Sequence, residues 1–133
     1  MNITLEQAER ILEVAKARAK KMGVAMNIAI VDGGANIQSF CRMDGALLGC
    51  ADIAIKKAKT SRFFDMDSGE IGKLSQPGGF LYNIEHSNGG LISFGGGVVL
   101  KNADHKIIGA IGVSGGTVEQ DHTVATAAAH AIV

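Results

Sequence analysis

Apolar residues recur at helical spacing near the two ends of this chain and in β-type runs between them. At the N-terminal end, Thr4 and Gln7 form a capping-box pattern, and the apolar stripe that follows stops at Gly23. This pattern predicts an amphipathic helix that ends at a glycine. Two apolar runs then predict a hairpin, with strands at residues 24–31 and 36–43 and a turn at residues 32–34.

The rest of the chain predicts two more long helices, three strands and one long loop. Residues 46–64 carry apolar side chains on one helical face and a basic run, from Lys56 to Arg62, on its solvated side. Residues 65–90 are rich in glycine and turn residues, which predicts a functional or mobile loop with one short helix at 69–75. Strands are then expected at residues 91–94, 98–101 and 106–113, and a closing helix at 117–132.

This order of elements predicts an α+β protein, an antiparallel sheet covered by helices. Tight connections within each group of strands favour antiparallel pairing. The 133 residues are expected to form a single domain, 1–133, that buries enough surface to need no disulfide or metal. Spacing alone does not define the fold more narrowly.

Charge and hydropathy exclude several classes of partner. The 13 basic and 13 acidic side chains cancel, which argues against nucleic-acid binding and against a basic membrane-binding patch. A net charge near zero lowers the barrier to self-association, so we expect a homo-oligomer. No apolar run approaches the roughly 20 residues of a transmembrane helix, and the N-terminal residues lack the pattern of a signal peptide, so the cytoplasm is the expected location.

Four polar residues have a structural interpretation. Asp32 and Asp44 each end a strand at a glycine corner, where a carboxylate caps a turn more often than it acts as an acid or base. Cys41 and Cys50 form no C-x-x-C pattern and are expected to be free, packed thiols.

The stretch IIGAIGVSGGTVEQDH, residues 107–122, predicts a buried strand, a glycine turn and a helix start capped by Thr117 and Gln120. We expect a Gly116→Val substitution to cost a few kcal/mol, because glycines in such a turn allow positive φ or close backbone approach. Three glycines share this expectation: Gly112, Gly115 and Gly116.

Together with two other stretches, this segment resembles the GlcG/HbpS family, which includes the C-terminal domain of the PduO cobalamin adenosyltransferases. IAIVDGGANIQSFCRMDGA, residues 28–46, is similar to the family's strand, turn, strand and Met-Asp-Gly corner. IAIKKAKTSRFF, residues 53–64, is similar to its Lys-Ala helix, and residues 89–116 are similar to its last three strands. The resemblance covers the chain apart from residues 65–87, and it implies a profilin-like five-stranded antiparallel sheet flanked by helices.

The resemblance also implies a function. It points to a small cytoplasmic protein that binds haem, or less often cobalamin or another tetrapyrrole, and acts as an accessory in glycolate, diol or glycerol metabolism. Two alternatives remain open, a corrinoid- or haem-modifying enzyme related to PduO and a structural oligomer without a cofactor. The sequence contains no H-E-x-x-H, G-x-S-x-G or dinucleotide-binding pattern, so it assigns no catalytic residue and no metal site.

His122 is the first candidate for a cofactor ligand. It shares an apolar stripe of the closing helix with Val118 and Ala125, so we expect its ring to face a packed surface, either as a core or subunit-interface histidine or as a haem or metal ligand. The family usually has an acid at this position, and a metal-binding role of that acid does not carry over to a histidine. If haem binds, we expect it in a pocket or at a subunit interface lined by the closing helix and residues 77–90.

Four further residues are candidates for cofactor binding. His86 lies in the long loop and ranks below His122, because a helix fixes a donor better than a loop does. Met43 could ligate iron through its sulfur or could belong to the core. Lys56 and Arg62 could neutralise the propionates of a haem.

Overall fold

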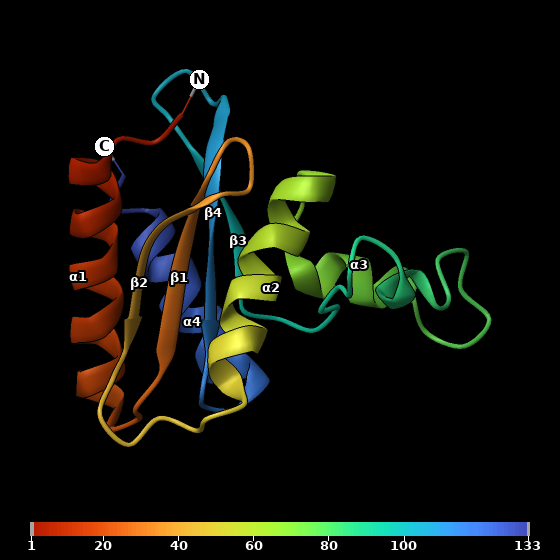
Figure 1. The fold of residues 1–133 in the computed structure, drawn as a ribbon, viewed down its shortest axis with the longest axis horizontal. Coiled ribbons are helices and arrows are strands. Elements are labelled where there is room, and N and C mark those ends of the chain that lie inside the picture. The colour runs from red at the N-terminus through yellow and green to blue at the C-terminus, as the bar shows by residue number, and fades with distance from the viewer. Residues whose placement is uncertain (1, 133) are drawn as a thin grey trace.

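The computed structural model describes residues 2–132, which form one antiparallel sheet with helices on both faces (Figure 1). The sheet has four strands in the order β2-β1-β4-β3. In chain order the elements are α1 (Leu5–Met22), β1 (Asn27–Asp32), β2 (Ile37–Arg42), α2 (Cys50–Phe64), α3 (Ser68–Leu74), the 3-10 helix η1 (Ile84–His86), β3 (Gly97–Lys101), β4 (Ile107–Ser114) and α4 (Val118–Ala129). The α+β prediction is confirmed.

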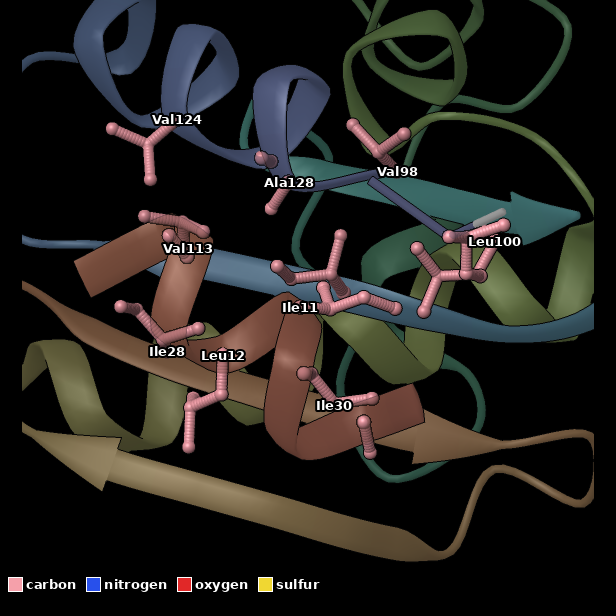
Figure 2. Close-up of a cluster of buried hydrophobic side chains, with 14 of the residues drawn as sticks. Ile11, Leu12, Ile28, Ile30, Val98, Leu100, Val113, Val124 and Ala128 are labelled. Carbon is pink, nitrogen blue, oxygen red and sulfur yellow. The ribbon is translucent and has the colours of Figure 1, made fainter. Parts of the chain in front are cut away.

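The main core lies between the sheet and the pair α1 and α4 (Figure 2). Ile28 and Ile30 of β1 point into this core, where they meet Ile11 of α1 and Val124 of α4. The intervening β1 residues point to the opposite face, as the two-residue period of a strand requires. Helix α2 covers that opposite face, and α3 with the residues after it projects from the body as an arm (Figure 1).

Helix α2 lies unusually close to the sheet, because small residues line the face that it covers. Ala29 and Ala110 pack against Ala54 and Ala58 of the helix. Gly112 comes closer still, since a Cβ atom on it would overlap the Ala54 carbonyl oxygen. The expectation that Gly112 serves close backbone approach is therefore confirmed.

The other two glycines of the turn before α4 differ from each other. Gly115 has φ +152°, and an added Cβ would lie 2.6 Å from the Ala25 carbonyl oxygen, so backbone approach restricts it as expected. At Gly116 an added Cβ would meet the Gln120 Oε1 atom at 2.6 Å and the Met26 methyl carbon at 3.2 Å. These atoms belong to side chains, and the φ of Gly116 is not positive, so the expectation of positive φ or close backbone approach is wrong for Gly116.

The strand expected at residues 91–94 does not form, so the prediction of five strands is wrong. The Ile92 N–H donates to Thr60 Oγ1 of α2 at 3.1 Å, and the Phe94 carbonyl accepts from Ser68 Oγ of α3 at 2.7 Å. These backbone groups are satisfied by helix side chains instead of a neighbouring strand. Gly96, at φ +124°, then turns the chain into β3.

The signals at the helix ends are confirmed. Both capping boxes form, with Thr4 and Thr117 each accepting the N–H three residues on, and Gly23 ends α1 in the left-handed conformation. Both cysteines are free and half-buried, as expected, and burial raises the pKa of the Cys41 thiol.

The buried face of α4 differs from the expected stripe through Val118 and His122. Asp121, Val124 and Ala125 face inward, whereas Val118 and His122 are exposed. The carboxylate of Asp121 is bonded to the Lys57 ammonium and to the Gly116 N–H, so position 121 faces inward where position 122 was expected to. An apolar stripe does not predict an inward-facing carboxylate.

Asp32 caps the hairpin turn, as expected. Its Oδ1 atom accepts the N–H groups of Gly34 at 2.8 Å and Asn36 at 2.9 Å, and these bonds, Asn36 first, hold the pKa of Asp32 below its usual range. A lowered pKa in the folded state gives stability that is present above about pH 4 and lost as pH falls through the folded pKa. We expect Asp32→Asn to flatten the acid limb of the stability curve below pH 4, measured by urea unfolding. An unchanged acid limb would contradict this assignment.

Candidate functional site

A hollow of about 670 Å³ lies between α3, the first turn of α4 and residues 93–95. The sheet faces and both hydrophobic cores are elsewhere, so the hollow is formed where the arm joins the body. Its volume is within the range of small-molecule sites in proteins. Most of the atoms that line it are apolar, as such sites usually require.

Glycines give this hollow its shape. Gly72 of α3 packs directly on residues 93–94. The approach is so close that a Cβ atom on Gly72 would overlap the Ser93 carbonyl oxygen. An added Cβ on Gly95 would lie 3.1 Å from Val118 Cγ1 and 3.6 Å from His122 Cβ. A side chain at position 95 would therefore fill the gap beside α4, and the glycine leaves it open.

The side chains around the hollow are an apolar pair and a polar rim. Phe94 is 43% exposed and Val118 is 47% exposed, so both offer apolar surface to a ligand. His122 of α4 lies beside them, and its Nε2 atom is 3.4 Å from Thr126 Oγ1 one turn further on. The charged rim residues are Glu70, Lys73 and Glu119, of which Glu70 and Lys73 pair at 2.9 Å.

A buried ion pair lies behind this wall. Lys57 of α2 is completely buried, and its Nζ atom donates to the Val113 carbonyl at 2.8 Å and to Asp121 Oδ2 at 3.1 Å. Asp121 is 2% exposed, and its Oδ1 accepts the Gly116 N–H at 2.9 Å. The expectation that the basic run of α2 is solvated is thus wrong for Lys57, because the glycine-lined contact brings this part of the helix against the sheet.

Burial lowers the pKa of Lys57, and the charge of Asp121 and its hydrogen bond oppose that shift. The Lys57 ammonium also lies 4.9 Å from the centre of the Phe94 ring, within the range of a cation–π interaction. The buried charge therefore touches two elements of the hollow, the ring of Phe94 and the first turn of α4.

The five residues expected to bind a cofactor do not gather in one place. Of the five, only His122 lines the hollow. Met43 lines a different hollow, where its sulfur accepts the Met26 N–H at 3.4 Å, and His86 is exposed on η1. Lys56 pairs with Asp52, and Arg62 pairs with Asp65.

The hollow and the expected haem pocket share only one side. Helix α4 lines the hollow as expected, but α3 and residues 93–95 form the other side, and residues 77–90 contribute no lining residue. Sequence reasoning missed Phe94, which lay in an expected strand, and Lys73, which lay on the expected short helix.

Neither a metal site nor a membrane-spanning helix is found within residues 2–132. No group of three or more histidine, cysteine or acidic side chains is placed to hold a metal ion in this part of the chain. No helix among the described residues is long and apolar enough to cross a membrane.

The chain is thus an α+β domain with an apolar, glycine-lined hollow and one histidine on its wall. Residues 3–130 match the family described as "Haem degrading protein HbpS-like", and the chain belongs to this family. This result confirms the family resemblance drawn from the sequence motifs.

Three relatives illustrate the match. The chain is 39% identical, over 95% of its own length and 89% of the relative's, to the "Uncharacterized 15.0 kDa protein in dhaT-dhaS intergenic region" of Citrobacter freundii. It is 35% identical to the corrinoid adenosyltransferase PduO of Citrobacter freundii over 99% of the chain, but it spans only 39% of PduO. A solved structure described as "PduOC:Heme Complex" is 34% identical, with a TM-score of 0.94 over 99% of this chain and 96% of that one.

Proposed function

We propose that this protein binds haem in the hollow between α3 and α4, with His122 as the ligand of the iron. The observation that carries the proposal is the position of His122, an imidazole held by a helix beside the apolar surfaces of Phe94 and Val118. The family and the haem complex of a 34% identical relative support the choice of haem. The cofactor is a proposal for this chain.

The residues present fit a flat, mostly apolar group. A porphyrin needs a slot, and the glycine at position 95 keeps the space beside α4 free of a side chain. Lys73 is the lysine that lines the hollow, and in this proposal it takes the role that the sequence suggested for Lys56 and Arg62. Glu119 would repel a propionate, and Lys73 would have to exchange its pairing with Glu70 for one with the propionate, so we expect the carboxylates to lie away from Glu119.

The chain's own groups would bind and orient the cofactor. His122 would coordinate the iron through a ring nitrogen, and the nearby Thr126 hydroxyl would help to fix the orientation of the ring. Phe94 would pack on the macrocycle and keep water from it. Bound haem would supply redox and ligand-binding chemistry, which depends on its axial ligand and on the polarity of its pocket.

The remaining parts of the proposal rest on the family. We propose a cytoplasmic homo-oligomer that acts as an accessory in glycolate, diol or glycerol metabolism. A corrinoid- or haem-modifying enzyme is the alternative, and the match to part of PduO supports keeping cobalamin as a second ligand in the test. A structural oligomer without a cofactor would bind neither.

We expect haemin to bind purified protein and to give a Soret band that depends on His122. His122→Ala should shift or abolish this band and weaken binding by about tenfold or more, because the iron loses its protein ligand. His86→Ala is the matched control, since His86 is exposed on η1 and does not line the hollow, and it should bind as the wild type does. The measurement is a haemin titration followed by absorbance, with a parallel titration of cobalamin.

Two results would overturn this assignment. If His122→Ala binds haemin with the wild-type spectrum and affinity, His122 is not the ligand. If the wild type binds cobalamin and not haemin, the protein is a corrinoid-binding member of the family.

A further inference from the structure

The buried ion pair of Lys57 and Asp121 does not line the hollow. It nevertheless connects two sides of the hollow, the helix α4 and the ring of Phe94. An ammonium group without any exposed surface costs free energy, and a well-packed apolar side chain of similar length avoids that cost. Packing alone would therefore not favour the charged pair. The ammonium group differs from an apolar side chain in that its hydrogen bonds hold specific acceptors in place.

The first connection is to the helix that carries His122. Lys57 donates to one oxygen of Asp121, and the Gly116 N–H donates to the other. Asp121 is thus fixed from α2 and from the turn before α4. Because His122 is the next residue, the direction in which its side chain leaves the helix follows from this clamp.

The second connection is to the aromatic wall. The ring of Phe94 lies over the Lys57 ammonium at 4.9 Å, and the Phe94 backbone carbonyl is held by Ser68 Oγ at 2.7 Å. One side chain from α2 therefore contacts both surfaces between which a planar ligand would lie. Gly96 makes room for it, since a Cβ on Gly96 would lie 2.6 Å from Lys57 Nζ.

We propose that Lys57 is the positioning residue of this site, which sets the placement of Phe94 against the first turn of α4 and so presents His122 to the bound tetrapyrrole. Lys57 itself does not touch the ligand. The inference rests on the proposed function for its ligand, but the positioning of α4 and Phe94 can be tested without one.

The test uses a variant in which both charges are removed, Lys57→Met with Asp121→Asn, because either single change leaves a buried charge unpaired and threatens folding. Asparagine keeps an oxygen for the Gly116 N–H. Lys59→Met is the matched control, a lysine of the same helix that does not line the hollow. Each variant is made twice, once with His122 present and once combined with His122→Ala. Haemin affinity and the Soret spectrum are measured for all of these proteins at a temperature where all are folded.

We expect the double variant to lose about tenfold in haemin affinity and to give a Soret spectrum close to that of His122→Ala. In the His122→Ala background the same double change should alter affinity by less than about threefold, because the effect acts through the histidine. Lys59→Met should match the wild type in both backgrounds. Equal losses in the two backgrounds, or an unchanged spectrum, would refute the positioning role.

A ligand-free measurement separates this inference from the haem proposal. Amide hydrogen exchange at Gln120 and Asp121, whose N–H groups bond to Thr117, should be faster in the double variant than in the wild type or in Lys59→Met, because the contact of Lys57 with the first turn of α4 is lost. If the wild type binds no haemin, the haem proposal fails and the exchange result alone decides. Unchanged exchange there would refute the positioning role as well.

Discussion

Replacing Gly112 with alanine is expected to lower the melting temperature by about 10 °C or more. The new methyl group would overlap the Ala54 carbonyl oxygen and lie 2.6 Å from the Ala58 nitrogen, and both atoms belong to the backbone of α2. Backbone atoms in a helix cannot rotate away as a side chain can, so α2 must move off the sheet. Overpacking usually costs 1–3 kcal/mol, and we expect about 3 kcal/mol here, with roughly 3–5 °C lost per kcal/mol.

Gly49→Ala is the matched control for this substitution. Gly49 precedes α2 with φ −65°, and no heavy atom lies within 4 Å of an added Cβ. Alanine there should leave stability unchanged or raise it slightly, since it restricts the unfolded chain. Thermal unfolding followed by circular dichroism measures both variants, and a Gly112→Ala protein that melts within 2–3 °C of the wild type would show that α2 is not held this close.

Asp121→Ala is expected to destabilise the protein by about 3–5 kcal/mol, because it leaves the Lys57 ammonium buried without its partner. The double variant Lys57→Met with Asp121→Asn should be much closer to the wild type, since neither charge is then buried. Urea unfolding at pH 7 measures the three proteins. If the double variant is as unstable as the single one, the loss comes from packing and not from charge.

The single variant should also show a distinctive pH dependence. Burial already lowers the pKa of Lys57, and removing the carboxylate removes the interaction that raises it. A base with a lowered pKa in the folded state binds fewer protons than the unfolded chain, so stability rises as pH increases through the folded pKa toward about 10.4. The deficit of Asp121→Ala against the wild type should therefore shrink between pH 7 and pH 10.

Local signals in the sequence predicted most of the fold and only part of the site. Thr4, Thr117 and Gly23 lie at helix ends where capping depends on a few neighbouring residues, and all three were placed correctly. The segment 91–94 is as apolar as a strand, but its pairing depended on hydroxyl groups of α2 and α3 that are distant in sequence. Such competition between distant partners cannot be read from hydropathy.

The site was harder to predict because two of its residues, His122 and Lys57, do not have the exposure that their local sequence pattern predicts. His122 lines the hollow, but it lies on the exposed face of α4 and not on the packed face that the apolar stripe predicted. Lys57 stands among three other basic residues of α2, and nothing in the local pattern separates it from them. Its burial follows from glycines on β3 and β4 that let α2 approach, and their effect appears only when the sheet is assembled.

The arm that projects from the body carries the only tyrosine of the chain, Tyr82, and the sequence contains no tryptophan. Tyr82 is 55% exposed, so the tyrosine fluorescence of this protein originates from an exposed side chain on the arm and not from the core. An emission change on dilution would thus report contacts of the arm with another copy. Global unfolding of the sheet could pass almost unseen at the same wavelength, and circular dichroism has to follow it.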